Sequence, residues 1–175
     1  DARVQEQIDV LNRDFAGLNT NSMGSFGSSL KSNTEIQFCL AQRDPNDQAT
    51  TGIERRQTSV TSFSYSDNGV KYYSSGGLDQ WNPDKYLNIW VCNLGGGLLG
   101  YAEFPTPGLS DSYGLVILYS GFGVTGAGWP YDGGATTTHE VGHCLNLKHI
   151  WGDDFTSCSG TDNCADTPNQ AGETS

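Results

Sequence analysis

The chain has three histidines, His139, His143 and His149, and they lie close together in the sequence. His139 and His143 are four residues apart, so on a helix they share one face and can bind the same metal ion. Glu140 points about 100° away around that helix and can approach a metal-bound water without being a ligand. The pattern HExxH is typical of zinc-dependent hydrolases in which the glutamate is the general base. We therefore predict a catalytic zinc site at His139 and His143, with Glu140 as its base.

A catalytic zinc ion takes three protein ligands and keeps one position open, so a third ligand is needed. In a continuous helix His149 would lie about 15 Å from His139, far beyond a zinc–nitrogen bond of ~2.0–2.1 Å. The helix, expected over about 136–146, must therefore end before His149. Asn146 predicts this end, because asparagine is the commonest substitute for glycine in a left-handed helix cap. A chance HExxH on a helix surface is the alternative, and the third histidine weighs against it.

Other elements must hold this helix in place. An amphipathic helix is predicted at the N-terminus, with Asp1 as its N-cap, Gly17 near its end, and apolar residues at spacings of four and three: Val4, Ile8, Leu11, Phe15 and Leu18. Strands are predicted at 34–42, which alternates, and at 86–94 and 114–123, which are almost continuously apolar. A further strand at 98–105 follows 86–94 after a short glycine-rich connection, so we expect these two to be antiparallel neighbours or to lie close together.

Length and charge narrow the classes of partner. The 175 residues fit one domain, and the net charge of −11, from 20 acidic and 9 basic residues, argues against nucleic acid and anionic membrane surfaces as partners. No apolar run reaches the ~20 residues that a membrane span needs. The composition, low in lysine and rich in glycine, serine, asparagine and threonine, favours an extracellular protein. An acidic chain suits cationic substrates or bound cations.

The five cysteines are odd in number and form no CxxC pair, which argues against a thiolate zinc knuckle. Cys39 and Cys92 lie in strand-like runs, and Cys144 lies on the metal-binding helix. We expect all three to be buried thiols that pack as small apolar groups. Cys158 and Cys164, in a loop, are the better candidates for a disulfide.

The stretch HEVGHCLNLKH resembles the extended zinc motif of the metzincin metallopeptidases. Its continuation, IWGDD followed by DNCADTPNQ, is similar to the pappalysin family, particularly to its secreted bacterial, cytophagalysin-like branch. Residues 76–105 and 114–124 also look like this group, so the resemblance covers nearly the whole chain. It implies an α/β (α+β) fold with a twisted, mostly parallel sheet, one antiparallel edge strand at 98–105, a backing helix and an active-site helix.

The resemblance also implies a function, that of a secreted zinc-dependent endopeptidase. His139, His143 and His149 would bind zinc, and Glu140 would be the general base and later the proton donor. An extended peptide or protein substrate would add to the edge strand. One alternative is a catalytically inactive secreted binding module on the same scaffold, but the intact Glu140 counts against it. A zinc hydrolase acting on something other than peptides is a second alternative, and the edge strand disfavours it.

The acidic loop after His149 offers hard oxygen ligands, and pappalysins hold structural calcium in this region. The resemblance therefore implies a possible calcium (Ca²⁺) site at Asp153, Asp154, Asp162, Asp166 and Thr167. A solvated acidic loop is the alternative. In related proteases the cysteine at the position of Cys158 pairs with one further downstream, so that pairing and a bridge to Cys164 both stay open.

Residues 1–175 would then be a single metallopeptidase catalytic domain that is apparently truncated at both ends. Metzincins carry a methionine-containing turn beneath the zinc, yet the only methionine here is Met23, and no tyrosine follows Tyr131. A strand normally precedes the backing helix, which here begins at Asp1. We expect mainly the N-terminal subdomain, with the C-terminal subdomain largely missing.

Overall fold

The computed structural model describes residues 1–20, 31–154 and 158–172, so Met23 and most of the loop around it lie outside the described residues. No described helix is long and apolar enough to cross a membrane. Within these residues the regular elements are two α-helices, three strands and three short 3-10 turns: α1 (Ala2–Phe15), η2 (Gly69–Lys71), η3 (Tyr73–Ser75), β1 (Ile89–Cys92), β2 (Gly100–Ala102), β3 (Leu115–Leu118), η4 (Tyr119–Gly121) and α2 (Ala135–Cys144).

The three strands form one small mixed sheet in the order β1-β3-β2. β1 pairs with β3 in parallel and β2 pairs with β3 antiparallel, so β2 is the expected antiparallel edge strand. The prediction of a mostly parallel sheet is confirmed only in part, because one of the two described strand pairs is antiparallel. β1 and β2 share the sheet but are not neighbours, since β3 lies between them. The central place suits β3, where Leu115, Val116 and Ile117 have no exposed surface.

The predicted strand at 34–42 is wrong. This segment is largely exposed and pairs with no strand, although a single bridge joins Arg43 to Ala49 just after it. At Phe38 the backbone bonds to the Asn12 side chain of α1 instead: the amide of Asn12 donates to the Phe38 carbonyl (2.9 Å), and the Phe38 N–H donates to Asn12 Oδ1 (2.7 Å). Cys39, expected to be buried, is exposed because this segment does not join the sheet.

Cys144 and Cys92 agree better with the prediction of buried thiols. Cys144 is buried, and Cys92 is half-buried, where burial raises the pKa of its thiol to about 11. All five cysteines are free thiols in the structure, so the bridge between Cys158 and Cys164 is not present, and the pairing of Cys158 with a cysteine further downstream stays a prediction.

Helix α1 begins and ends near the expected residues. Asp1 holds the N-cap position, but its carboxylate pairs with Arg55 instead of capping the helix. At the other end Gly17 takes a left-handed backbone conformation (φ 69°), so the helix stops and Leu18, expected in the core, is 71% exposed. The buried residues of α1 face the rest of the fold: Gln7, Val10, Leu11 and Phe15.

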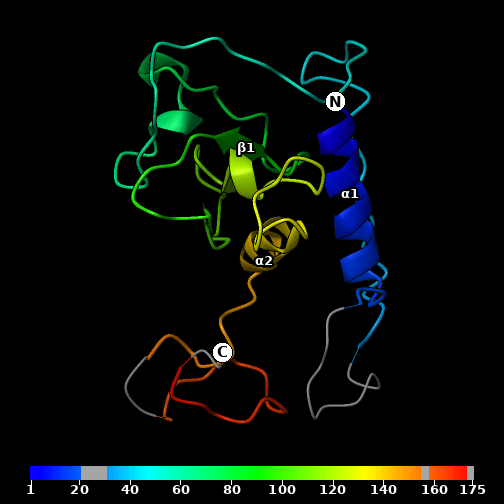
Figure 1. Ribbon diagram of the computed structural model, residues 1–175, viewed down its shortest axis with the longest axis vertical. Coiled ribbons are helices and arrows are strands. Elements are labelled where there is room, and N and C mark those ends of the chain that lie inside the picture. Colours follow the sequence, from blue (N-terminus) through cyan, green and yellow to red (C-terminus); the bar gives the residue numbers. More distant parts are fainter. Residues whose placement is uncertain (21–30, 155–157, 173–175) are drawn as a thin grey trace.

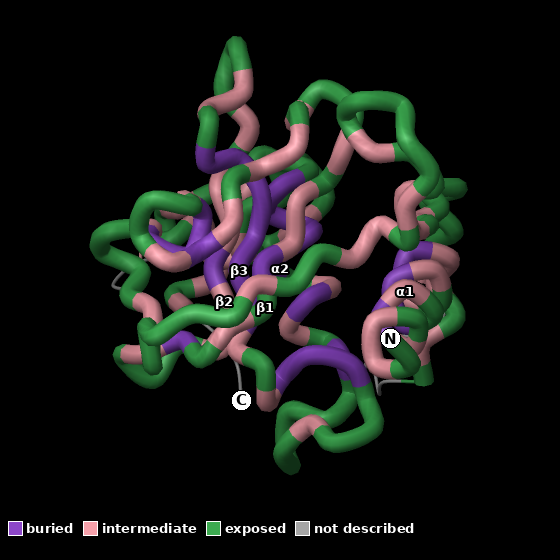
Figure 2. The backbone as a smooth tube through the Cα atoms, turned by 90° about the horizontal axis from the view of Figure 1, so that it is seen from above, coloured by how far each residue is buried: buried purple, intermediate pink, exposed green. Residues whose placement is uncertain are grey.

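The core lies on both faces of the sheet, and buried backbone runs through β3 and α2 (Figure 2). Side chains alternate along β3, so Leu115 and Ile117 pack with α1 and with Val141 of α2, whereas Val116 packs on the other face with Trp90. The sheet therefore supports α2 from one side only.

Helix α1 fixes α2 through buried polar contacts, and the two helices lie beside each other (Figure 1). The Gln7 side chain donates to the Gly134 carbonyl (3.1 Å) and accepts from the Gly123 N–H (2.8 Å), both in the loop that leads into α2. Thr138 in the first turn of α2 donates its hydroxyl proton to Asp14 (2.7 Å). The N-terminal helix therefore has the backing role that the sequence predicts.

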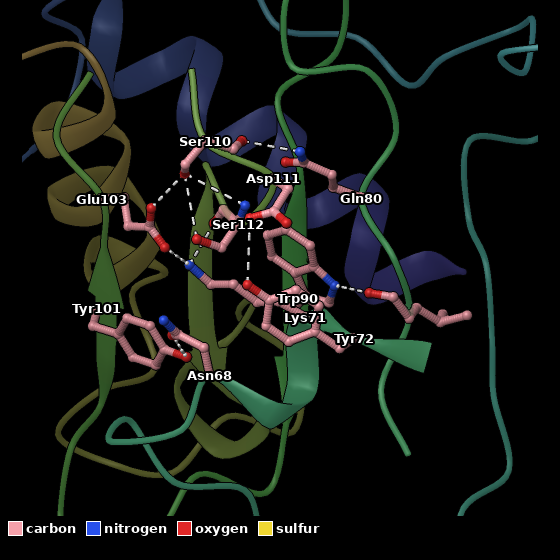
Figure 3. Close-up of polar contacts among 11 residues, drawn as sticks. Asn68, Lys71, Tyr72, Gln80, Trp90, Tyr101, Glu103, Ser110, Asp111 and Ser112 are labelled. Atoms are coloured by element: carbon pink, nitrogen blue, oxygen red, sulfur yellow. Dashed lines mark hydrogen bonds and ion pairs between the residues drawn. The ribbon is translucent and has the colours of Figure 1, made fainter. Parts of the chain in front are cut away.

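A buried lysine secures the edge strand from the opposite face of the sheet (Figure 3). Lys71 has no exposed surface, and its Nζ donates to Glu103 Oε1 and to the Ser112 carbonyl, each at 2.7 Å. It also lies over the rings of Trp90 and Tyr101, 5.4 and 5.1 Å from their centroids. These contacts tie the η2 turn to the residue that follows β2 and to the segment that precedes β3.

The protonation of this pair follows from its surroundings. Burial lowers the pKa of Lys71, while the hydrogen bond and charge of Glu103 oppose the shift. Burial alone would raise the pKa of Glu103, but hydrogen bonds from Lys71, Ser112 and Ser110 outweigh it and hold that pKa below its ordinary value. The lowered pKa of Glu103 favours the carboxylate form that accepts the hydrogen bond from Lys71.

We expect Lys71→Met to lower the free energy of unfolding by about 2 kcal/mol, because it leaves the half-buried Glu103 carboxylate without its counter-ion and the Ser112 carbonyl without its donor. Lys71→Met combined with Glu103→Gln should cost less than the sum of the two single changes. Urea unfolding of the three variants measures this. The exposed Lys85→Met is the control and should change stability by less than about 0.5 kcal/mol. An equally small effect of Lys71→Met would contradict the assigned role.

Candidate metal centre

Helix α2 ends at Cys144 in a tight, hydrogen-bonded turn, two residues earlier than expected. Asn146 takes the left-handed conformation (φ 71°), its N–H donates to the His143 carbonyl, and the Leu147 N–H donates to the Gly142 carbonyl, both at 2.9 Å. This pair of bonds is the Schellman motif, which satisfies carbonyls at a helix end and reverses the chain. The predicted role of Asn146 is therefore confirmed.

The turn brings the three histidines together. His139 Nε2 lies 3.0 Å from His143 Nε2 and 3.1 Å from His149 Nε2. The three ring nitrogens all lie within 4.8 Å of one another, and among the described residues no other group of three or more His, Cys, Asp or Glu side chains is placed to hold a metal ion. His143 is buried, His149 half-buried and His139 more open, so the nitrogens converge at the surface of the fold.

Hydrogen bonds to the far ring nitrogens orient two of the imidazoles. His143 Nδ1 donates to the Leu147 carbonyl (2.7 Å), and His149 Nδ1 donates to the Asp153 carboxylate (2.5 Å). Because a carbonyl and a carboxylate only accept, each Nδ1 carries the proton and each Nε2 keeps its lone pair for a metal. Trp151 stacks on His149 with ring centroids 4.4 Å apart, which holds that ring further.

The convergent nitrogens fit a zinc ion. A tetrahedral zinc with bonds of ~2.0–2.1 Å separates its nitrogen ligands by about 3.3–3.4 Å, close to the 3.0 and 3.1 Å between His139 Nε2 and the other two Nε2 atoms. In these tautomers the Nε2 atoms of His143 and His149 carry no proton, so neither can donate to the other. Burial, together with the neighbouring His143 and His149, lowers the pKa of His139 and so favours the neutral ring that a metal requires.

Glu140 lies on the side of α2 that faces the sheet, and it does not belong to the group of metal ligands. It is only 8% exposed, and Thr137, Val141 and Cys144 on the same side of the helix are buried with it. Burial raises the pKa of Glu140 to about 7. A carboxylate with such a pKa suits proton exchange near neutral pH.

The acidic residues after His149 are engaged by protein donors. Asp153 accepts from His149, a role that sequence reasoning missed although the four-residue spacing was a signal for it. Asp154 Oδ2 accepts the Gly160 N–H (2.6 Å), and Asp162 Oδ1 accepts the Cys164 N–H (2.9 Å), a bond that lowers the pKa of Asp162. Together with Asp166 and Thr167 they form no metal-binding group of the kind described above.

Comparison with known proteins places this site in a family. The model of the peptidase M43 family, described as pregnancy-associated plasma protein-A, matches residues 72–175. An extracellular metalloprotease of Arthroderma otae is 40% identical over 179 residues, which cover 100% of this chain and 54% of that protein. An extracellular metalloprotease of Arthroderma benhamiae is 30% identical over 174 residues, covering 96% of this chain and 48% of that protein.

Among solved structures, mature mirolysin of Tannerella forsythia in complex with a cleaved peptide superposes with a TM-score of 0.92 at 51% identity, covering 99% of this chain and 66% of that chain. A structure of mirolysin in complex with a small compound gives a TM-score of 0.93 at the same coverage. This chain thus spans about half the length of the fungal relatives and about two thirds of mirolysin. The family match over more than half of the chain and the match in fold agree, and the chain belongs to the peptidase M43 family, the pappalysin group of the metzincin metallopeptidases.

Proposed function

We propose that this chain is the metal-binding part of a secreted zinc-dependent endopeptidase. The observation that carries the proposal is the convergence of the Nε2 atoms of His139, His143 and His149 beside a buried glutamate, Glu140. Membership of the peptidase M43 family and relatives named extracellular metalloproteases support it. The three histidines hold the zinc ion and Glu140 is the general base.

Each residue of the site has its own role in the proposed hydrolysis. A bound zinc ion supplies Lewis acidity to the scissile carbonyl and to the attacking water. Glu140 takes the proton of that water and later delivers it to the leaving amine, for which a pKa raised to about 7 by burial is suited. Leu147 and Asp153 keep His143 and His149 in the tautomer that leaves Nε2 free for the metal.

The substrate is a peptide in extended conformation that lies along β2. In the described part of the chain β2 pairs with β3 alone, so its other edge offers free backbone groups for an added strand. The edge lies next to α2, which packs on β2 and β3. A solved mirolysin structure contains a cleaved peptide, which supports a peptide substrate for this relative.

Residues 1–175 form part of one catalytic domain in this proposal. A calcium site in the loop stays a prediction, because the carboxylates of Asp154 and Asp162 are engaged by backbone N–H groups and no described cluster gathers them. Asp153 is better assigned to His149 than to calcium, because it already accepts the Nδ1 proton of that histidine.

The proposal is tested by Glu140→Gln in the full-length protein. We expect peptide cleavage to fall by about 10²- to 10⁴-fold because the proton acceptor is removed, while bound zinc, measured by elemental analysis, is unchanged. The exposed Glu54→Gln is the matched control and should cleave as the wild type does. Full cleavage by Glu140→Gln would refute the role of Glu140 as the base.

A second test addresses the turn that assembles the ligands. Asn146→Val places a β-branched residue in the left-handed region, so we expect the turn to open and zinc affinity to fall by about 10- to 100-fold. Asn146→Gly keeps the conformation and should bind zinc as the wild type does. Competition with a chromogenic chelator measures both affinities. Equal affinities for the valine and glycine variants would mean that the histidines converge without this turn.

A further inference from the structure

Gly100, the first residue of β2, lies directly beside α2, the helix that carries Glu140. A Cβ placed on Gly100 would come within 3.0 Å of Glu140 Cγ, of Ile117 Cδ1 and of the Val116 carbonyl oxygen. Ordinary contacts between carbon atoms are about 3.5–4.0 Å, so a side chain at Gly100 would fit only if these neighbours moved by a few tenths of an ångström. The stem of Glu140 therefore packs against the bare backbone of the edge strand.

Backbone conformation does not require a glycine at this position. The left-handed glycines of the chain include Gly96 and Gly97 just before β2, but Gly100 is not among them. A glycine inside a strand weakens the strand, and its recognised use is to let another group approach the backbone closely. The group that approaches here is Glu140, the one carboxylate of α2.

We propose that Gly100 is a positioning residue for Glu140, a role that rests on the proposed function. The missing side chain lets Glu140 lie flat on the strand along which the substrate would pair. The Glu140 carboxylate is thereby held in a fixed position relative to the edge of β2 and to the histidines of α2. A larger residue would push the Glu140 stem outward, because the Val116 carbonyl on the opposite side is backbone of the central strand and the third neighbour, Ile117 Cδ1, lies in the packed core.

Gly100→Ala in the full-length, zinc-loaded protein tests this role. We expect kcat to fall about tenfold, because a displacement of a few tenths of an ångström misplaces a reacting group, while KM and zinc content change little. A crystal structure of the variant should show Glu140 Cγ displaced away from β2. Gly133→Ala is the matched control: Gly133 is exposed, does not have a left-handed backbone and has no atom within 4 Å of a Cβ placed on it, so its kcat should equal that of the wild type.

A second variant separates positioning from core packing. Adding Ile117→Val to Gly100→Ala removes Cδ1, one of the three atoms that the new methyl group meets. We expect the melting temperature to recover relative to Gly100→Ala alone, while kcat stays low because the contact with Glu140 remains. Recovery of kcat together with the melting temperature would show that Gly100 acts only through the core and would overturn the positioning role.

Glu140→Gln in the same series separates this inference from the proposed function. Cleavage that survives Glu140→Gln would overturn the proposed function and the positioning role together. Wild-type kcat in Gly100→Ala beside an inactive Glu140→Gln would overturn the positioning role alone. A low kcat in both, with zinc retained, is the result that supports it.

Discussion

Asn146 has a left-handed backbone conformation, and the two hydrogen bonds of this turn fix the direction of the chain after α2. A helix that continued would carry His149 away from the other ligands. The same turn presents the Leu147 carbonyl to His143 Nδ1, at 2.7 Å, and so sets the tautomer of that ligand. One backbone conformation therefore brings in the third histidine and orients the second. The site depends on this turn more than on any single ligand, because it fixes two ligands at once.

Two sides of helix α2 have different roles. One side presents His139 and His143 to the metal, and the other packs Glu140 against the sheet. The edge strand between Glu140 and the Lys71–Glu103 ion pair is thus held from both faces. Contacts from α1 secure the loop before α2 and its first turn. These supports keep Glu140, the three histidines and the outer edge of β2 in a constant relation, as the proposed hydrolysis of an extended peptide requires.

The convergence of the three histidines and the helix end could be predicted because they follow from spacing along one helix and from the conformational preference of asparagine. The error at 34–42 could not be found from the sequence, because alternation of apolar residues does not show whether a second strand pairs with the segment. In the structure the backbone of Phe38 bonds to the Asn12 side chain. Strand order likewise depends on contacts distant in sequence. The acidic loop and the family resemblance predict Asp153 as a calcium ligand, whereas in the structure its carboxylate accepts the Nδ1 proton of His149.

The central claim, that three histidines converge on one zinc ion, is tested most directly by X-ray absorption spectroscopy of the zinc-loaded, full-length protein. We expect a zinc ion with three imidazole nitrogens at ~2.0–2.1 Å and one further light-atom ligand, and no sulfur. Replacing His149 by alanine should reduce the imidazole count by one. A thiolate sulfur at ~2.3 Å, or an imidazole count unchanged by loss of His149, would contradict it.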